Sequence, residues 1–166
     1  MNIHAAAKTL LTIAPNLEAY CLGLERRNLF RASHAYSSLK DPEELCRIII
    51  DQTYRISYLR DLNRKIQTLI TCFPEKHAKI IKTYYLKRKP IKVIAEKLGI
   101  EERTVFRHIH EATSYFAFRL DRLGINSFTF GRLLEQNQWI NAEHQKVLES
   151  LSNFSGEKVD TNFSSK

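Results

Sequence analysis

Residues 91–112 of this 166-residue chain read IKVIAEKLGIEERTVFRHIHEA. Apolar side chains recur at helical spacing through Ile91–Leu98, and Gly99 follows at once. Because glycine readily adopts the left-handed backbone conformation that ends a helix, we expect a short helix, a tight turn and a new helix from about Glu102. This stretch therefore predicts a helix-turn-helix over Ile91–Ala112.

The helix expected from about Glu102 has two faces, which the helical period keeps apart. One face is apolar at intervals of three and four residues, and we expect it to be buried: Val105, Ile109, Ala112, Phe116, Leu120 and Leu123. The opposite face carries long polar and aromatic side chains: Arg103, Arg107, His110, Ser114 and Phe118, flanked by Thr104, Phe106 and Glu111. The buried stripe thus determines which side chains this helix presents to a partner.

The outer face suits the major groove of duplex DNA, which admits an α-helix. Arginine can bridge the two acceptors of guanine, and threonine or phenylalanine can contact the methyl group of thymine. We therefore predict base contacts from Glu102, Arg103, Thr104, Phe106, Arg107 and His110. Four basic residues on or beside the start of the shorter helix are predicted to bind phosphates, and so to carry affinity rather than sequence choice: Lys87, Arg88, Lys89 and Lys92.

Positive charge is concentrated around this unit. The chain has 26 Lys and Arg against 18 Asp and Glu, a net charge of +8. Residues 74–112 contribute ten basic and five acidic residues, or +5, compared with +3 for residues 1–73 and zero for residues 113–166. A concentrated positive field attracts polyanions. The distribution favours nucleic acid as the partner over a basic face that is merely solvated.

The run from Val93 to Val105, followed by Ile109 and Ala112, resembles the promoter-binding helix-turn-helix of sigma factors, their region 4. Residues Pro74–Tyr85, where a proline followed by an acidic residue marks another helix start, are similar to the helix that precedes it in that family. The resemblance covers residues 74–113 or so. It implies binding to a promoter element of the minus-35 type and contact with RNA polymerase.

Two features depart from the sigma pattern. Glu101 and Glu102 stand where small extracytoplasmic-function sigma factors usually carry Ser or Thr and then a basic residue. These carboxylates stabilise a helix N-terminus but repel phosphate. They therefore have one of three roles: they only start the helix, they accept hydrogen bonds from cytosine amino groups, or they shift the position of the helix on DNA. Residues 1–73 do not resemble the sigma region that melts promoter DNA. The overall layout is similar to small phage or mobile-element transcription regulators of Gram-positive bacteria.

Outside this unit the sequence predicts an all-α protein, because Gly and Pro are few and helix-forming residues dominate. A first helical segment spans Ile3–Ser33, with Pro15 interrupting it or opening a second helix, and a Ser-rich loop covers residues 32–40. The run Asp41–Glu44 is a strong helix start, with a capping Asp followed by Pro and two carboxylates. A long helix should run from there to about Cys72.

The long helix carries an apolar seam made of two interleaved sets of positions seven residues apart: Ile49, Ile56, Asn63 and Ile70, and Leu45, Gln52, Leu59, Ile66 and Phe73. Such a seam needs a partner helix. The partner is either the first helical segment, folded back as a hairpin, or the same helix of a second subunit. In the second case a homodimer would form through residues 43–73, and Asn63 would fix its register.

The chain after the helix-turn-helix begins with turn signals, and residues 128–151 then predict one or two more helices. Polar residues dominate from Ser152 onward. We accordingly expect an N-terminal helical segment over residues 1–73 and a DNA-binding domain over 74–124. C-terminal helices over 125–152 and a flexible tail over 153–166 complete the predicted organisation.

Metal and disulfide chemistry receive little support. Cys21, Cys46 and Cys72 are odd in number and have no short spacing, which fits neither a disulfide framework nor a zinc knuckle. His108 and His110 are two residues apart and so point to different sides of a helix. We expect no metal ion.

Enzymes and membrane proteins also receive little support. There is no Ser-His-Asp order, carboxylate pair or glycine-rich phosphate loop, so we expect no enzymatic activity and no cofactor. The chain shows no signal peptide and no long apolar run, so we expect no membrane association and a cytoplasmic location. Two alternatives to a transcription regulator stay open: a DNA-binding accessory of a recombination or mobile-element system, and a protein-interaction adaptor.

Overall fold

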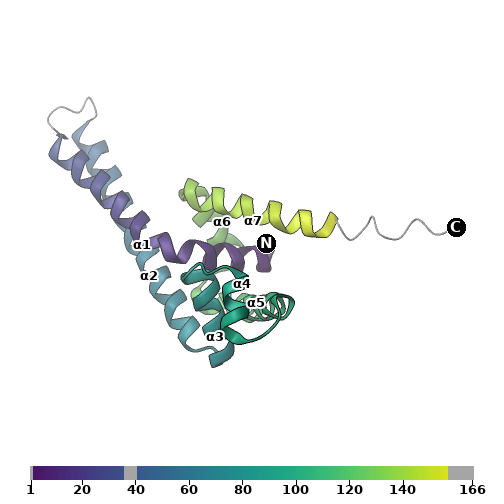
Figure 1. Cartoon of the computed structure of the whole chain (residues 1–166). Helices are drawn as coiled ribbons and strands as arrows, with labels where there is room; N and C mark the ends of the chain where they lie inside the picture. Colours follow the sequence, from purple (N-terminus) through teal and green to yellow (C-terminus); the bar gives the residue numbers. More distant parts are fainter. Residues whose placement is uncertain (1, 36–40, 157–166) are drawn as a thin grey trace.

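The computed structural model describes residues 2–35 and 41–156. Within those ranges every regular element is helical, as the composition predicts. The elements are α1 (Ile3–Ser33), α2 (Pro42–Thr71), α3 (Glu75–Ile81), the π-helical η2 (Lys82–Leu86), α4 (Ile91–Leu98), α5 (Glu102–Ala117), the 3₁₀ segment η3 (Leu120–Leu123), α6 (Ser127–Gln136) and α7 (Gln138–Gly156). In Figure 1, α1 and α2 form a long hairpin that projects from a body made of the shorter helices.

The start of α2 follows the prediction from its sequence. The Asp41 carboxylate accepts hydrogen bonds from the backbone N–H groups of Glu43 (3.1 Å) and Glu44 (3.3 Å), and Pro42 occupies the first turn. The cap satisfies two of the donors that the first turn of a helix leaves without intrahelical partners. The long helix then runs to Thr71, close to the predicted end.

The apolar seam of α2 is covered by α1 of the same chain. Leu59, Ile66 and Ile70 are fully buried and belong to one cluster with Leu17 and Leu24 of α1. The sequence left two partners for this seam open, and in the structure the partner is the first helix of the same chain, which forms a hairpin with α2.

Pro15 does not interrupt α1, so the expectation of a break or a second helix there is wrong. Proline removes one backbone donor and bends a helix, but a helix continues through it when packing holds both sides. Ala14 and Leu17 on either side of Pro15 are buried. Figure 1 accordingly shows α1 changing direction along its length, from the body into the hairpin.

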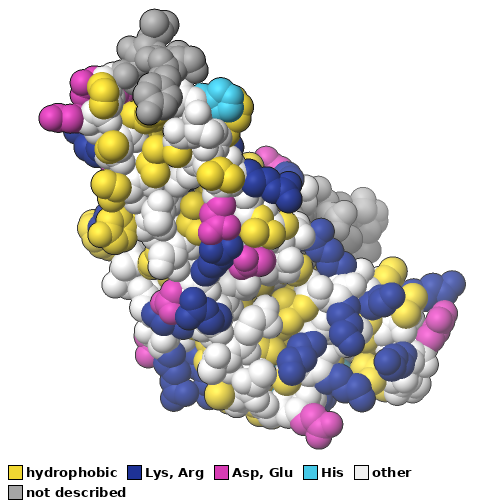
Figure 2. Space-filling view, turned by 90° about the vertical axis from the view of Figure 1, so that its left-hand side faces the viewer, with side chains coloured by type: hydrophobic (Ala, Val, Ile, Leu, Met, Phe, Trp, Pro, Cys, Tyr) yellow, Lys and Arg dark blue, Asp and Glu magenta, His cyan; other side chains and the backbone are white. Residues whose placement is uncertain are grey.

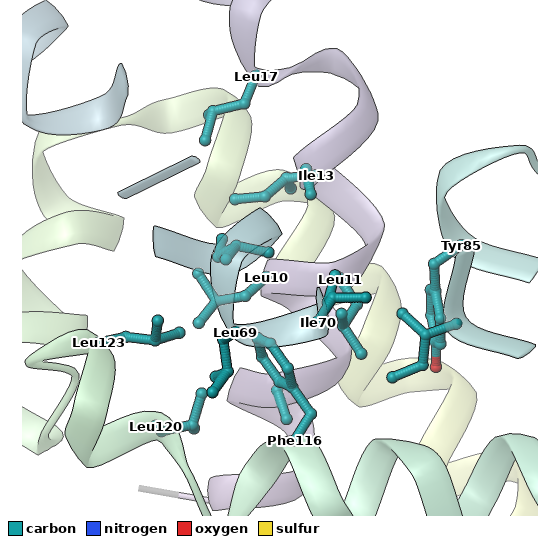
Figure 3. Packing of buried hydrophobic residues seen from close by; sticks show 14 of the residues in the cluster. Leu10, Leu11, Ile13, Leu17, Leu69, Ile70, Tyr85, Phe116, Leu120 and Leu123 are labelled. Carbon is teal, nitrogen blue, oxygen red and sulfur yellow. The ribbon is translucent and has the colours of Figure 1, made fainter. Parts of the chain in front are cut away.

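The first half of α1 lies at the centre of the body. Ala5, Ala6 and Ala7 are fully buried together with Leu10 and Leu11, so this part of the helix is covered on nearly all sides. Figure 3 shows Leu10 and Leu11 among side chains of α2, η2, α5 and η3, including Ile70, Tyr85, Phe116 and Leu120. The N-terminal segment is thus part of the scaffold of the helix-turn-helix.

Two helices follow η3, within the range that the sequence allows. Asn126 caps α6 in a capping box with Thr129, and Asn137 separates α6 from α7. Because α7 continues to Gly156, residues 153–156 are helical and do not belong to a tail, which corrects the prediction for them. Residues 157–166 of the predicted tail and residues 36–40 of the predicted loop lie outside the described residues.

Candidate nucleic-acid interface

The support helix predicted over Pro74–Tyr85 begins as α3 and ends as the π-helical η2. Tyr85 of η2 is buried, and its hydroxyl lies 3.1 Å from the Thr113 hydroxyl of α5. Burial raises the pKa of Tyr85 to about 12, so the phenol keeps its proton and its hydrogen-bonding capacity. This buried polar contact fixes the support helix against α5.

The turn between α4 and α5 forms as the sequence predicts. Gly99 has φ +64° and ψ +34°, the left-handed conformation, and follows directly on Leu98, the last residue of α4. Its N–H and that of Ile100 bond back to the carbonyls of Glu96 and Ala95, at 3.4 and 3.2 Å. These bonds satisfy carbonyls that the last turn of α4 leaves free and set the direction in which α5 starts.

The apolar stripe predicted for the second helix is buried. Exposed fractions are 8% or less at all six positions: Val105, Ile109, Ala112, Phe116, Leu120 and Leu123. The α-helix itself is shorter than expected, however, because α5 ends at Ala117 and the last two stripe residues belong to η3. The stripe nevertheless determines which side of α5 faces outward, which is the basis of the site prediction.

The outer side of α5 is open at its N-terminal half. Glu102, Arg103 and Arg107 are exposed, Phe106 is 52% exposed, and Thr104 is half-buried. An apolar ring with half its surface in water stabilises the fold little, and among the described residues Arg103 has no ion pair. These side chains are free to contact a partner.

Arg107 is held only loosely. Its Nε lies 3.9 Å from Glu111 Oε1, whereas His108 Nδ1 lies 3.3 Å from Glu111 Oε2. The hydrogen bond from His108 lowers the pKa of Glu111, with smaller effects from the charges of His108, Lys76 and Arg107. Glu111 is therefore an ionised acceptor engaged mainly by His108, and the Arg107 guanidinium can leave it at little cost.

The C-terminal half of the outer face is partly covered by the first turn of α1. The ring of His4 stacks on His110, with centroids 5.2 Å apart and planes 9° apart, and His4 Nε2 lies 3.0 Å from the Ser114 hydroxyl. Burial, and secondarily the charge of His110, lower the pKa of His4. Sequence analysis did not identify His4, because no local pattern indicates which element far away in the chain covers α5.

The four predicted phosphate-binding residues are all exposed: Lys87, Arg88, Lys89 and Lys92. The first three form the turn between η2 and α4, where Arg88 has a positive φ of 50° and the Lys89 N–H donates to the Thr83 carbonyl at 3.1 Å. Figure 2 shows Lys and Arg side chains gathered at the lower right of its face, the side of the molecule where α4 and α5 lie in front in Figure 1. The basic residues of the turn and of α5 are therefore all exposed and available to a polyanion.

Three further properties concern metal binding, membrane insertion and the cysteines. Within residues 2–35 and 41–156, no three His, Cys, Asp or Glu side chains are grouped so that they can hold a metal ion. None of the described helices combines the length and the hydrophobicity that crossing a lipid bilayer requires. Cys46 and Cys72 are exposed and Cys21 is buried, all as free thiols.

Comparison with known proteins identifies the central segment. Residues 63–113 match the family model described as "Sigma-70, region 4", which begins 11 residues earlier than the predicted resemblance and includes the end of α2. This segment is similar to that family, whose members are DNA-binding helix-turn-helix domains connected with transcription. The match spans less than a third of the 166 residues. No curated protein and no solved structure matches the chain significantly.

Proposed function

We propose that this protein is a transcription regulator that reads duplex DNA with the N-terminal half of α5. One observation carries the proposal: in a segment that matches sigma region 4, Arg103, Phe106 and Arg107 are exposed at the start of the second helix. The fold does not use these side chains, because the opposite stripe of α5 makes the core contacts. A helix with free arginines at its start suits the major groove.

The proposed base-reading set consists of Glu102, Arg103, Thr104, Phe106, Arg107 and His110. Arg103 and Arg107 lie one helical turn apart and suit guanine, and Phe106 suits a thymine methyl group. His110 lies at the edge of this set, where its stacking on His4 fixes the orientation of the ring. Within the set, Arg103 and Arg107 are proposed to contribute most to sequence choice.

The proposed phosphate-binding set consists of Lys87, Arg88, Lys89 and Lys92. These residues lie at the turn before α4 and in its first helical turn, which supports assigning them to the DNA backbone beside the groove that α5 is proposed to enter. Neutralised phosphates release counterions, which makes the affinity fall steeply with salt but gives no sequence preference.

The two sets respond differently to substitution. Arg107→Ala is expected to cost about 1–3 kcal/mol on the preferred site and to relax the preference at one base pair. Lys89→Ala is expected to weaken binding to all duplexes about equally and to reduce the salt slope by roughly 1. Electrophoretic mobility or fluorescence polarisation over a salt series measures both.

Lys146→Ala serves as the matched control. Lys146 is an exposed cation on α7 that pairs with Glu143 and belongs to neither proposed set, so its removal should leave DNA affinity unchanged. The assignment of the two sets is wrong if Arg107→Ala and Lys89→Ala both lose affinity with no change in preference. An affinity that does not fall steeply with salt would contradict nucleic-acid binding altogether.

We further propose that the protein acts at bacterial promoter DNA in the cytoplasm together with RNA polymerase, as the region 4 match suggests. Site selection from random duplexes with and without polymerase tests this. A single half-site of the minus-35 type retained only with polymerase supports the sigma-like role. A palindrome bound by the protein alone indicates instead a dimeric repressor or activator, and light scattering then tests for a dimer.

A further inference from the structure

A second charged surface lies outside the helix-turn-helix. A groove of about 930 Å³ lies between the outer half of the hairpin and α6, and its lining includes four arginines and two tyrosines: Arg27 and Arg31 of α1, Tyr54, Arg55 and Tyr58 of α2, and Arg132 of α6. We call it the arginine groove. Its volume is that of a site for a ligand or a short segment of a partner, which typically measures about 300–1,000 Å³.

The positive charge of the arginine groove is not neutralised by the fold. Asp51 is the one acidic residue in the lining, so four arginines leave three surplus positive charges. Among the described residues, none of the four arginines forms an ion pair with a carboxylate. Arg60, less than two turns from Arg55 on α2, is bound by both Glu18 and Glu25. The hairpin thus neutralises one arginine and leaves the groove charged.

Arg55 is only partly satisfied by the fold. One terminal N–H of its guanidinium donates to the backbone carbonyl of Gln136 at 2.8 Å, at the end of α6. Its Nε is buried and has no hydrogen-bond partner. A buried donor without an acceptor is unfavourable, so the hydrogen-bonding capacity of this guanidinium is not fully used by the fold.

The composition of the lining favours a peptide as the occupant. Tyrosine and arginine are among the side chains that contribute most to protein–protein binding, and the half-buried Ile48 adds apolar surface to the lining. Carboxylates pair with guanidinium groups through two parallel hydrogen bonds. None of the lining residues belongs to α4 or α5, and in Figure 1 α6 lies behind these two helices, so the arginine groove and the proposed DNA-reading face are separate surfaces.

We propose that the arginine groove binds an acidic segment of a partner protein. Carboxylates of that segment pair with Arg55 and Arg132, and a neighbouring apolar side chain packs on Tyr58 and Ile48. The proposal does not rest on DNA binding. It gives the protein a second negatively charged partner, which binds at a separate surface.

Selection from a displayed library of random short peptides, with the full chain as bait, tests the proposal. Enriched peptides should combine Asp or Glu with an adjacent apolar residue. In fluorescence polarisation, Arg132→Ala and Arg55→Ala should each weaken a selected peptide about tenfold or more, which corresponds to roughly 1.4 kcal/mol. Replacing Asp and Glu in the peptide by Asn and Gln should weaken binding to the same extent.

The controls separate this surface from the rest of the molecule. Arg26→Ala and Arg64→Ala remove exposed arginines of α1 and α2 that do not line the groove, and they should leave peptide affinity unchanged. Arg132→Ala should also leave duplex affinity unchanged, whatever that affinity is. Arg132 lies on an exposed part of α6, so its removal should not affect folding, which thermal melting checks.

Three outcomes overturn the proposal. The first is a library selection without enrichment for acidic residues. The second is a selected peptide that binds Arg55→Ala and Arg132→Ala as well as it binds the unmodified chain. The third is single-stranded oligothymidine that binds in the groove more tightly than the best peptide and loses affinity in the same two variants, which identifies the surface as a nucleic-acid groove.

Discussion

The hairpin of α1 and α2 and the pair of α4 and α5 differ in what their arginines do. Arg60 of the hairpin lies 3.0 Å from a Glu18 oxygen and 2.5 Å from a Glu25 oxygen, whereas Arg107 of α5 has one carboxylate at 3.9 Å. Arg103 has none among the described residues. The charge of Arg60 joins the two helices of the hairpin, whereas the charge of Arg103 and Arg107 on α5 is left for a partner. Whether an arginine has a carboxylate partner therefore distinguishes structural from functional arginines better than its exposed fraction does.

The two regions are nevertheless joined through α1. Its first half packs under α5, and its second half is the partner of the α2 seam. Perturbations of the common core should therefore affect both regions, while perturbations of the charged faces should affect only one. The following expectations run from the largest effect to the smallest.

Phe116→Ala should destabilise the whole body. Phe116 is fully buried and packs among α1 and α2 side chains, so its loss should lower the free energy of unfolding by about 3–5 kcal/mol, measured by urea denaturation. Phe118→Ala is the matched control, because Phe118 is 84% exposed, and its effect should stay within about 0.5 kcal/mol. Similar losses for the two variants would contradict the described orientation of α5.

Gly99→Ala should affect the helix-turn-helix alone. A Cβ at Gly99 meets no atom within 4 Å, so the cost is the left-handed backbone conformation itself, about 1–2 kcal/mol. Gly99→Asn should cost less, since asparagine tolerates this conformation better. Equal stability of Gly99→Ala and the unmodified chain would show that the turn has another conformation in solution.

Arg60→Ala should loosen the hairpin and leave DNA affinity unchanged. The hydrogen bond from Arg60 lowers the pKa of Glu25, so this carboxylate stabilises the folded state at pH values above its ordinary pKa. That stabilisation is lost as the pH falls through the lowered pKa. Stability measured as a function of pH should fall less steeply in acid for Arg60→Ala than for the unmodified chain, and an identical slope would contradict the pairing.

The contact between His4 and His110 should give the smallest effect. Because the pKa of His4 is lowered in the folded state, the unfolded chain binds more protons there, and stability should decrease as the pH falls from the ordinary histidine pKa toward the lowered value. Burial lowers the pKa of His144 in the same direction, so His4→Gln should remove only part of this slope. A slope that His4→Gln leaves unchanged would assign the effect to His144.

The parts of the fold that were predicted correctly depend on neighbours in the sequence. The turn at Gly99, the Asp41 cap and the buried stripe from Val105 to Phe116 each follow from a conformational preference or a helical period. Within the candidate site, the exposure of Arg103 and Arg107 follows from the same period. Local rules were sufficient wherever one helix determines its own faces.

The parts that were missed depend on contacts between distant elements. Helix α1 continues past Pro15 because packing holds the residues on both sides of it. Helix α5 ends at Ala117, and the 3₁₀ segment η3 follows. The stacking of His4 on His110 joins residues more than 100 positions apart. The run Ala5–Ala7 carried a usable signal, because small apolar residues on every side of a helix indicate burial all around it.

Selection of bound sequences from random duplex DNA is the most direct test of the central claim, that α5 reads DNA with arginines that the fold does not use. The unmodified chain and the Arg103→Ala, Arg107→Ala double variant are compared under the same salt conditions. The account predicts a short enriched site containing guanine for the unmodified chain and loss of that enrichment in the variant, with the same stability in urea. Enrichment of the same site by both proteins, or of no site by either, would contradict it.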